Sequence, residues 1–151
     1  MKPAPKDWPR LSSSVFYEDA PAMIDWLMKA FDFKLKIKVE GDKPGVIIHA
    51  ELTYGEAIIM VCSHSKLTGN RFGVPFVSPK EAGGNTQTIM LHVPDVDAHH
   101  AHAKAAGAEI VMEPTVSDYG PEYWCDKGYG AKDPEGHLWW FAERLRNPPG
   151  A

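Results

Sequence analysis

The stretch YGAKDPEGHLWWF, residues Tyr129–Phe141, decides the fold of this chain. Its central residues, Asp133-Pro134-Glu135-Gly136, have the composition of a tight turn. Short runs rich in apolar and aromatic residues flank the turn, and they predict two strands, Tyr129–Lys132 and His137–Ala142. The sequence therefore predicts two consecutive strands joined by a turn near the C-terminal end.

The residues before this stretch predict three more elements. Thr88–Val93 has the composition of a strand, and Val96–Ala106 is an alanine-rich segment that predicts a helix with Asp95 or Asp97 at its start. Ala108–Met112 predicts a further strand. The second half of the chain thus has the predicted order strand, helix, strand, strand, strand.

The first half of the chain predicts the same order. Asp19 is expected to cap a helix with Pro21 in its first turn, and apolar residues recur at helical spacing as far as Phe31. The predicted strands are Leu11–Tyr17, Phe33–Val39, Val46–Tyr54 and Ala57–Cys62. The chain is therefore predicted to be an α+β protein with two βαβββ modules.

These elements set the expected domain organisation. The 151 residues are expected to form one domain, with module one at about residues 10–62 and module two at about residues 88–145. The connection between them, about residues 63–87, is rich in Gly, Pro, Ser and Asn and is long for a compact domain. Long connections of this kind often carry function.

Charge and composition exclude several classes of function. The formal net charge is −4, whereas nucleic-acid binding needs a concentrated surface of Lys and Arg, so no nucleic-acid partner is expected. No signal peptide and no membrane-spanning run are predicted, which makes the cytoplasm the expected location. The two cysteines, Cys62 and Cys125, lack a C-x-x-C spacing and are expected to be reduced.

The predicted hairpin in module one sorts its side chains onto two faces. If Gly55-Glu56 is a two-residue turn, Tyr54 pairs with Ala57, and one sheet face becomes mostly apolar. The other face then carries a mixed set typical of a ligand-binding surface: His49, Glu51, Thr53, Ile58, Met60 and Cys62. His49 and Glu51 are candidate catalytic residues, either as an acid/base pair or as two metal ligands, and the alternative is that they are hydrogen-bonded wall residues.

Three stretches resemble the glyoxalase, bleomycin-resistance and extradiol-dioxygenase group, the vicinal oxygen chelate superfamily. They are VFYEDAPAMIDWLMKAFDF, LHVPDVDAHHAHAKAAGAEI and YGAKDPEGHLWWF, and together they span most of the chain. The resemblance implies two half-barrels with helices outside and a central cup. In metal-using members, His, Gln or Glu from the first and fourth strands of each module bind a divalent ion in this cup.

The matching positions in this chain are Ser12, Met60, Thr88 and Trp140. Hydroxyl, thioether and indole groups form no adequate ligand set for Zn²⁺, Fe²⁺, Ni²⁺ or Mn²⁺. We therefore expect no metal and no other cofactor. Trp140 would instead offer a stacking surface, because strand alternation sends it to the side opposite Trp139 and Phe141.

Other candidates complete the expected ligand-binding set. His92 alternates with Thr88 and Met90 along a strand, which would point it into the cup. Aromatic residues gather toward the C-terminal end, and from these Trp124 and Tyr129 join the set. A group of histidines lies on the predicted second helix and is expected to be solvated: His99, His100 and His102.

These observations lead to three hypotheses of function. The first is a metal-free protein that binds a small aromatic or peptide-like molecule. The second is a metal-dependent lyase or dioxygenase whose ligands have moved to His49, Glu51 and His92. The third is a structural or partner-binding module without a small ligand. A homodimer is expected, because related two-module proteins commonly pair and because open sheets leave edges that association can cover.

Overall fold

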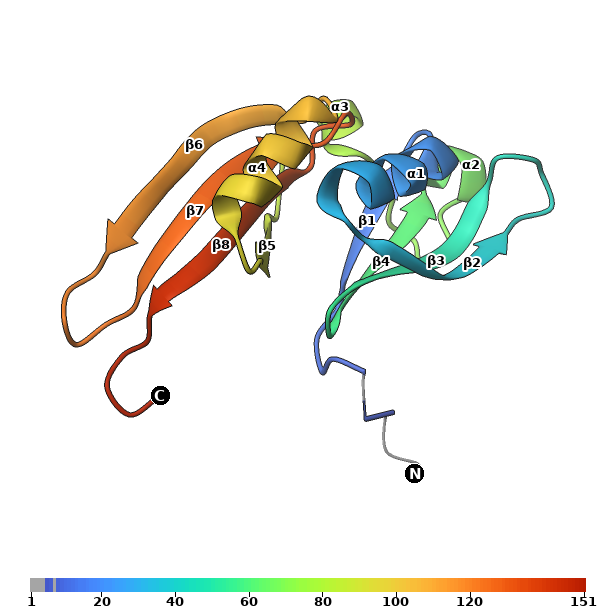
Figure 1. The fold of residues 1–151 in the computed structure, drawn as a ribbon. Helices are drawn as coiled ribbons and strands as arrows, with labels where there is room; N and C mark the ends of the chain where they lie inside the picture. Colours follow the sequence, from blue (N-terminus) through green and yellow to red (C-terminus); the bar gives the residue numbers. More distant parts are fainter. Residues whose placement is uncertain (1–4, 7) are drawn as a thin grey trace. The chain divides into compact units, whose positions relative to one another are not determined.

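The structure is a computed structural model that describes residues 5–6 and 8–151. Its helices and strands follow the order that the sequence predicts, and two further short helices lie in the connection between the modules (Figure 1). They are β1 (Ser13–Tyr17), α1 (Ala20–Phe31), β2 (Lys34–Glu40), β3 (Ile47–Tyr54), β4 (Ala57–Ser63), α2 (Ser65–Thr68), α3 (Pro79–Ala82), β5 (Ile89–His92), α4 (Val96–Ala105), β6 (Glu109–Asp118), β7 (Cys125–Lys132) and β8 (Leu138–Arg146). In the described part of the chain, no helix has both the length and the apolar character needed to cross a bilayer.

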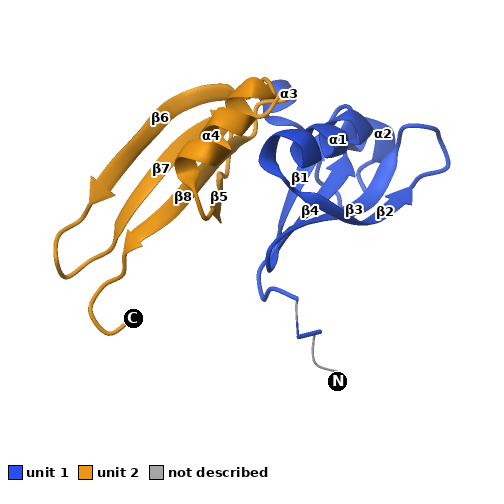
Figure 2. Cartoon of the chain, in the orientation of Figure 1, with its two compact units in different colours: residues 1–84 blue, residues 85–151 orange. Residues whose placement is uncertain are grey.

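The chain divides into two compact units, and the boundary in the sequence lies between Gly84 and Asn85 (Figure 2). Each unit contains one four-stranded sheet, with strand order β1-β4-β3-β2 in the first and β5-β8-β7-β6 in the second. In each sheet the first strand of the module pairs in parallel with its last strand, and the other pairs are antiparallel. The predicted α+β fold with two βαβββ modules is confirmed.

The first sheet has the predicted hairpin register. Tyr54 pairs with Ala57 around a turn in which Gly55 adopts a φ of 54°, a conformation that glycine tolerates well. On the face that packs under α1, the side chains of these two strands are apolar and buried: Ala50, Leu52, Ile59 and Val61. Asp19 caps α1 as predicted, and its Oδ1 accepts a hydrogen bond from the Ala22 N–H at 3.2 Å.

The core of the second unit includes a histidine that was expected to be solvated. His99 on α4 is 6% exposed, its Nδ1 lies 2.7 Å from the Tyr129 hydroxyl, and its ring centroid lies 4.4 Å from that of Phe141. The expectation was wrong for His99, because α4 is short of large apolar residues and packs this imidazole against the sheet instead. The hydrogen bond to Tyr129 satisfies a polar group that would otherwise be costly to bury.

The connection after β4 is more ordered than its composition suggested. Its Glu81 carboxylate binds the Lys66 ammonium at 2.6 Å and the buried His64 Nδ1 at 2.9 Å, and these contacts hold the pKa of Glu81 below its usual value. Phe76 stacks on Phe16 of β1 with ring centroids 4.4 Å apart. The connection therefore packs onto the first unit.

Strand β6 is longer than predicted and extends to Asp118. The added part contains Pro114 and no apolar alternation, so its composition gave no strand signal. It is an edge strand, and its pairing with β7 shifts between Met112 and Thr115, so Pro114 lies at an irregularity of an edge strand, where proline is tolerated.

The turn before β8 is organised by one buried carboxylate. Asp133 is 4% exposed, and its Oδ1 accepts hydrogen bonds from the N–H groups of Glu135 at 3.1 Å and His137 at 3.0 Å. Its Oδ2 accepts from the indole N–H of Trp139 at 3.1 Å. One side chain thus fixes both the turn and the rotamer of the largest buried side chain in the described chain.

We predict that Asp133→Ala lowers the free energy of unfolding by about 3 kcal/mol, because it leaves three buried donors without an acceptor. Asp133→Asn is the matched control and should cost less, because it keeps one carbonyl oxygen for the backbone donors. Urea unfolding followed by tryptophan fluorescence measures both. An Asp133→Ala protein as stable as the parent would contradict this account of the turn.

Candidate functional site

In the described residues, α1 packs on one face of the first sheet and α4 packs on one face of the second, and we call the opposite face of each sheet its helix-free face. On the first helix-free face, the β3–β4 register gathers the side chains that the sequence predicted. They are His49, Glu51, Thr53, Ile58, Met60 and Cys62. From β1, Ser14 pairs with Met60 and Phe16 pairs with Cys62, so both belong to the same face.

Glu51 is the most unusual residue of this face, because it is a carboxylate that is only 5% exposed. Its Oε1 lies 3.1 Å from His49 Nε2, so these two residues form a hydrogen-bonded pair. Its Oε2 is buried and has no hydrogen bond. The ammonium of Lys36 lies 3.8 Å from Oε2, which is an ion-pair distance but too long for a hydrogen bond.

Lys36 lies on this face because Lys34 pairs with Thr53 and Leu35 pairs with Leu52, so the next residue of β2 points to the side of Glu51. The pairing then shifts, and Ile37 becomes the partner of Glu51. Its ammonium also lies 4.6 Å from the centroid of the Trp8 ring, in a cation–π contact. Sequence reasoning missed both Lys36 and Trp8, because alternation assigns the lysines of β2 to a solvated face and does not give the register of β2 against β3.

In the first strand, the residue that joins this face is not the expected Ser12. Ser12 directly precedes β1, and its Oγ is buried without a hydrogen-bond partner. Ser14, two residues later, is the residue that pairs with Met60. Cys62 lies on the same face, and burial raises the pKa of its thiol, so the thiol is protonated at neutral pH.

Trp140 dominates the second helix-free face. It is partly exposed, whereas Trp139 and Phe141 are buried on the α4 side, as strand alternation predicted. A Cβ added to Gly130 would lie 2.6 Å from Cζ3 of Trp140, so only glycine lets the indole lie this close to the β7 backbone. Met90 pairs with Trp140 from β5 and is 55% exposed. Thr88, just before β5, is exposed.

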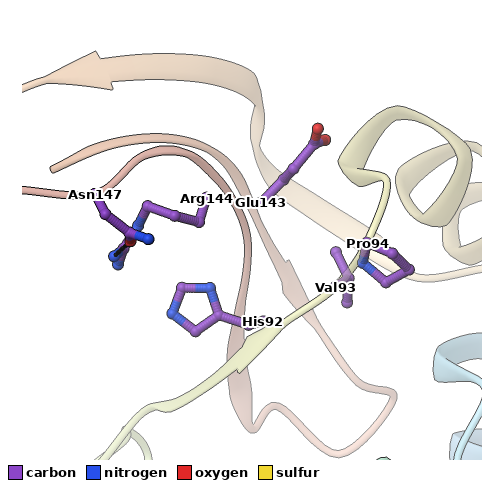
Figure 3. Close-up of a pocket in the computed structure, with 6 residues that line it drawn as sticks. All are labelled: His92, Val93, Pro94, Glu143, Arg144 and Asn147. Atoms are coloured by element: carbon purple, nitrogen blue, oxygen red, sulfur yellow. Dashed lines mark hydrogen bonds between the residues drawn. The ribbon is translucent and has the colours of Figure 1, made fainter. Parts of the chain in front are cut away.

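His92 ends β5 and lines a pocket of about 600 Å³ (Figure 3). In this view, the side chains of Arg144 and Asn147 lie near His92, while the Glu143 carboxylate points away from them. Arg144 binds the Asp126 carboxylate and donates a hydrogen bond to Asn147 Oδ1 at 2.9 Å. Glu143 Oε2 accepts a hydrogen bond from the Val96 N–H at 3.0 Å.

Two predicted ligand-binding residues lie elsewhere. Tyr129 is completely buried between α4 and the second sheet, where it stacks on Phe141 with ring centroids 4.9 Å apart. Its place in the core corrects the prediction that it lines the ligand surface. Trp124 is 43% exposed in the loop between β6 and β7, beside Tyr119 and Tyr123. In residues 5–6 and 8–151, no three His, Cys, Asp or Glu side chains gather closely enough to hold a metal ion.

Comparison with known proteins identifies relatives of this sequence in mycobacteria. An uncharacterized protein of Mycobacterium bovis is 33% identical over 138 residues, which cover 91% of this chain and 85% of the relative. An uncharacterized protein of Mycobacterium tuberculosis has the same identity over 138 residues, which cover 76% of its length.

Solved structures and a family pattern complete the comparison. TioX from Micromonospora sp. ML1 is 30% identical with a TM-score of 0.68, and the match covers 91% of this chain and 99% of TioX. A glyoxalase/bleomycin resistance protein/dioxygenase from Nocardioides has a TM-score of 0.63 at 19% identity, covering 95% of this chain and 89% of that one. The sequence pattern of the Glyoxalase/Bleomycin resistance protein/Dioxygenase superfamily matches residues 11–141, and the chain belongs to this superfamily.

Proposed function

We propose that the protein binds a small aromatic or peptide-like molecule on the helix-free faces of its sheets, and that it does so without a metal ion. The observation that carries the proposal is Trp140, whose indole lies over Gly130 on the second helix-free face. A partly exposed aromatic ring held against backbone offers a rigid surface for stacking, and it loses little conformational entropy when a ligand binds.

The donor set on the strands supports the metal-free part of the proposal. Metal-using members of the superfamily take their ligands from the first and fourth strands of each module. Here the register pairs Ser14 with Met60 and Met90 with Trp140 at those strands. Hydroxyl and thioether groups are weak ligands for Zn²⁺, Fe²⁺, Ni²⁺ and Mn²⁺, and an indole N–H is only a donor. These residues do not fit any of these divalent ions, and no chemical step is assigned to a metal ion.

The alternative of an enzyme with relocated ligands has less support. His49 Nε2 and Glu51 Oε1 bind each other at 3.1 Å, so each of these atoms already has a partner inside the protein. His92 lines the pocket of Figure 3, and among the described residues no three His, Cys, Asp or Glu side chains gather closely enough to hold a metal ion. The hydrogen bond favours the interpretation of His49 and Glu51 as paired wall residues of a binding surface.

Substitution of Trp140 tests this proposal. Trp140→Ala should weaken the binding of indole, used as a probe, at least about tenfold, because the stacking surface is lost. Its free energy of unfolding should fall less than that of Trp139→Ala, since truncating a buried Trp costs about 3–5 kcal/mol. NMR titration with indole and urea unfolding of both variants measure these effects. If Trp140→Ala instead destabilises as much as Trp139→Ala and binds indole unchanged, Trp140 is a core residue.

We also propose that the protein is a homodimer. The edge strand β2 supports this proposal, because it carries three apolar side chains that are 40–45% exposed: Leu35, Ile37 and Val39. Open edges with apolar side chains are surfaces that association covers. Light scattering at micromolar concentration should give about twice the chain mass of 16.7 kDa. A mass of one chain under these conditions would refute the dimer.

A further inference from the structure

We propose that the first helix-free face contains a binding site for a protonated amine, and that the side chain of Lys36 occupies this site in the structure. The inference rests on the proposed function, since it specifies the chemical class of the molecule bound at that surface. The ligand would be an aromatic or peptide-like molecule that carries an ammonium group.

The Glu51 carboxylate supplies the first part of the site. Its Oε2 is buried without a hydrogen bond, while Oε1 is held by His49 at 3.1 Å. A buried charged oxygen without a donor is costly, and native proteins contain few of them. The Lys36 ammonium approaches only to 3.8 Å, so it offsets part of the charge without donating a hydrogen bond. An acceptor of this kind fits a ligand that brings its own N–H donor.

Trp8 supplies the second part. The Lys36 ammonium lies 4.6 Å from the centroid of the Trp8 ring, so the same cation is close to both an indole and a carboxylate. An aromatic ring combined with a negative charge is the arrangement by which proteins recognise ammonium groups. Lys36 therefore shows where a cation is stable on this face.

The Lys36 side chain can leave this site when a ligand amine binds. The Lys36 side chain is 40% exposed, whereas the Glu51 side chain is 7% exposed. A lysine with a long flexible stem can turn its ammonium into water, where it is well hydrated. The ligand amine then restores the positive charge beside Glu51 and can approach within hydrogen-bond distance, which Lys36 does not. One ammonium group therefore lies beside Glu51 before the exchange and one lies there after it.

The neighbouring side chains favour an amine attached to an apolar body. Ile58 and Met60 lie on the same face of β4, and Met60 pairs with Glu51 across the hairpin. Thioether and aliphatic groups pack well against aromatic rings. The geometry thus suits an arylalkyl amine, with its ammonium at Glu51 and its ring over Met60.

The test compares three indoles that differ in charge: tryptamine as the cation, 3-methylindole as the neutral probe and indole-3-acetate as the anion. NMR titration of the ¹⁵N-labelled full chain at pH 7 measures each dissociation constant. Tryptamine should bind at least about tenfold more tightly than 3-methylindole, and indole-3-acetate should bind most weakly, because hydrogen bonds to charged groups are the strong ones. The Trp8 indole N–H and Glu51 amide signals should shift with tryptamine.

Two variants should change this preference in opposite directions. Glu51→Gln removes the negative charge and should abolish the preference for tryptamine. Lys36→Met removes the internal competitor and should tighten tryptamine binding several-fold, an effect that loss of structure would not produce. Lys38→Met is the matched control, because Lys38 is an exposed lysine on the same strand that pairs with Ala50 of the helix-covered face, and it should leave all three constants unchanged.

The outcomes separate this inference from the proposed function. Tryptamine and 3-methylindole binding with equal affinity would leave the aromatic-binding function standing and overturn the amine site. Weaker tryptamine binding in Lys36→Met would overturn it as well. If none of the three indoles binds at millimolar concentration, the proposed function itself is contradicted, and the amine site is rejected with it. If a variant does not fold, the probe series and the Trp8 and Glu51 signals of the parent protein decide.

Discussion

One helix packs on one face of each sheet, and the rest of this structure depends on that constraint. Because side chains alternate between the two faces of a strand, a helix on one face sorts every strand into buried apolar residues and a second set that no helix covers. In the first unit, this sorting places Leu52 in the core and Glu51 on the opposite side. In the second unit, it separates Trp139 from Trp140. The candidate binding residues are the ones that the helices leave uncovered.

The two helix-free faces differ in chemistry. The first carries a charged group of three residues, Lys36, His49 and Glu51, in which one carboxylate oxygen lacks a hydrogen bond. The second carries a large aromatic surface, where Trp140 lies over a glycine. A molecule with an ammonium group and an aromatic body matches the first, and a planar aromatic molecule matches the second. Among the described residues, neither face gathers three His, Cys, Asp or Glu side chains closely enough to hold a metal ion.

Periodicity and turn chemistry predicted most of the fold. The two-residue turn at Gly55-Glu56 fixed the register of the β3–β4 hairpin, and from this register followed the face of Glu51. The extension of β6 beyond Met112 was not predictable, because that segment is held by pairing with β7 and contains a proline. The position of His99 was not predictable either. Its burial depends on a partner, Tyr129, that lies thirty residues away in the sequence.

The candidate site was only partly predictable for similar reasons. Alternation correctly placed His49, Glu51 and Met60 on one face, because a regular hairpin transmits its register to every residue. Lys36 and Trp8 were missed, since neither the register of β2 against β3 nor the contact between Lys36 and Trp8 leaves a periodic signal. Tyr129 was misassigned, because aromatic composition alone does not distinguish a core residue from a binding residue.

We propose, above all, that these helix-free faces bind a small molecule and hold no metal. Elemental analysis of protein purified without a histidine tag tests it most directly, together with the melting temperature before and after chelator treatment. The account predicts much less than one equivalent of Zn, Ni, Fe or Mn per chain and an unchanged melting temperature. A bound metal at a hundredfold excess over its dissociation constant stabilises a fold by about 2.7 kcal/mol, an effect that such a measurement detects. One equivalent of metal, removed with a loss of stability and abolished by His49→Ala or Glu51→Ala, would contradict the account.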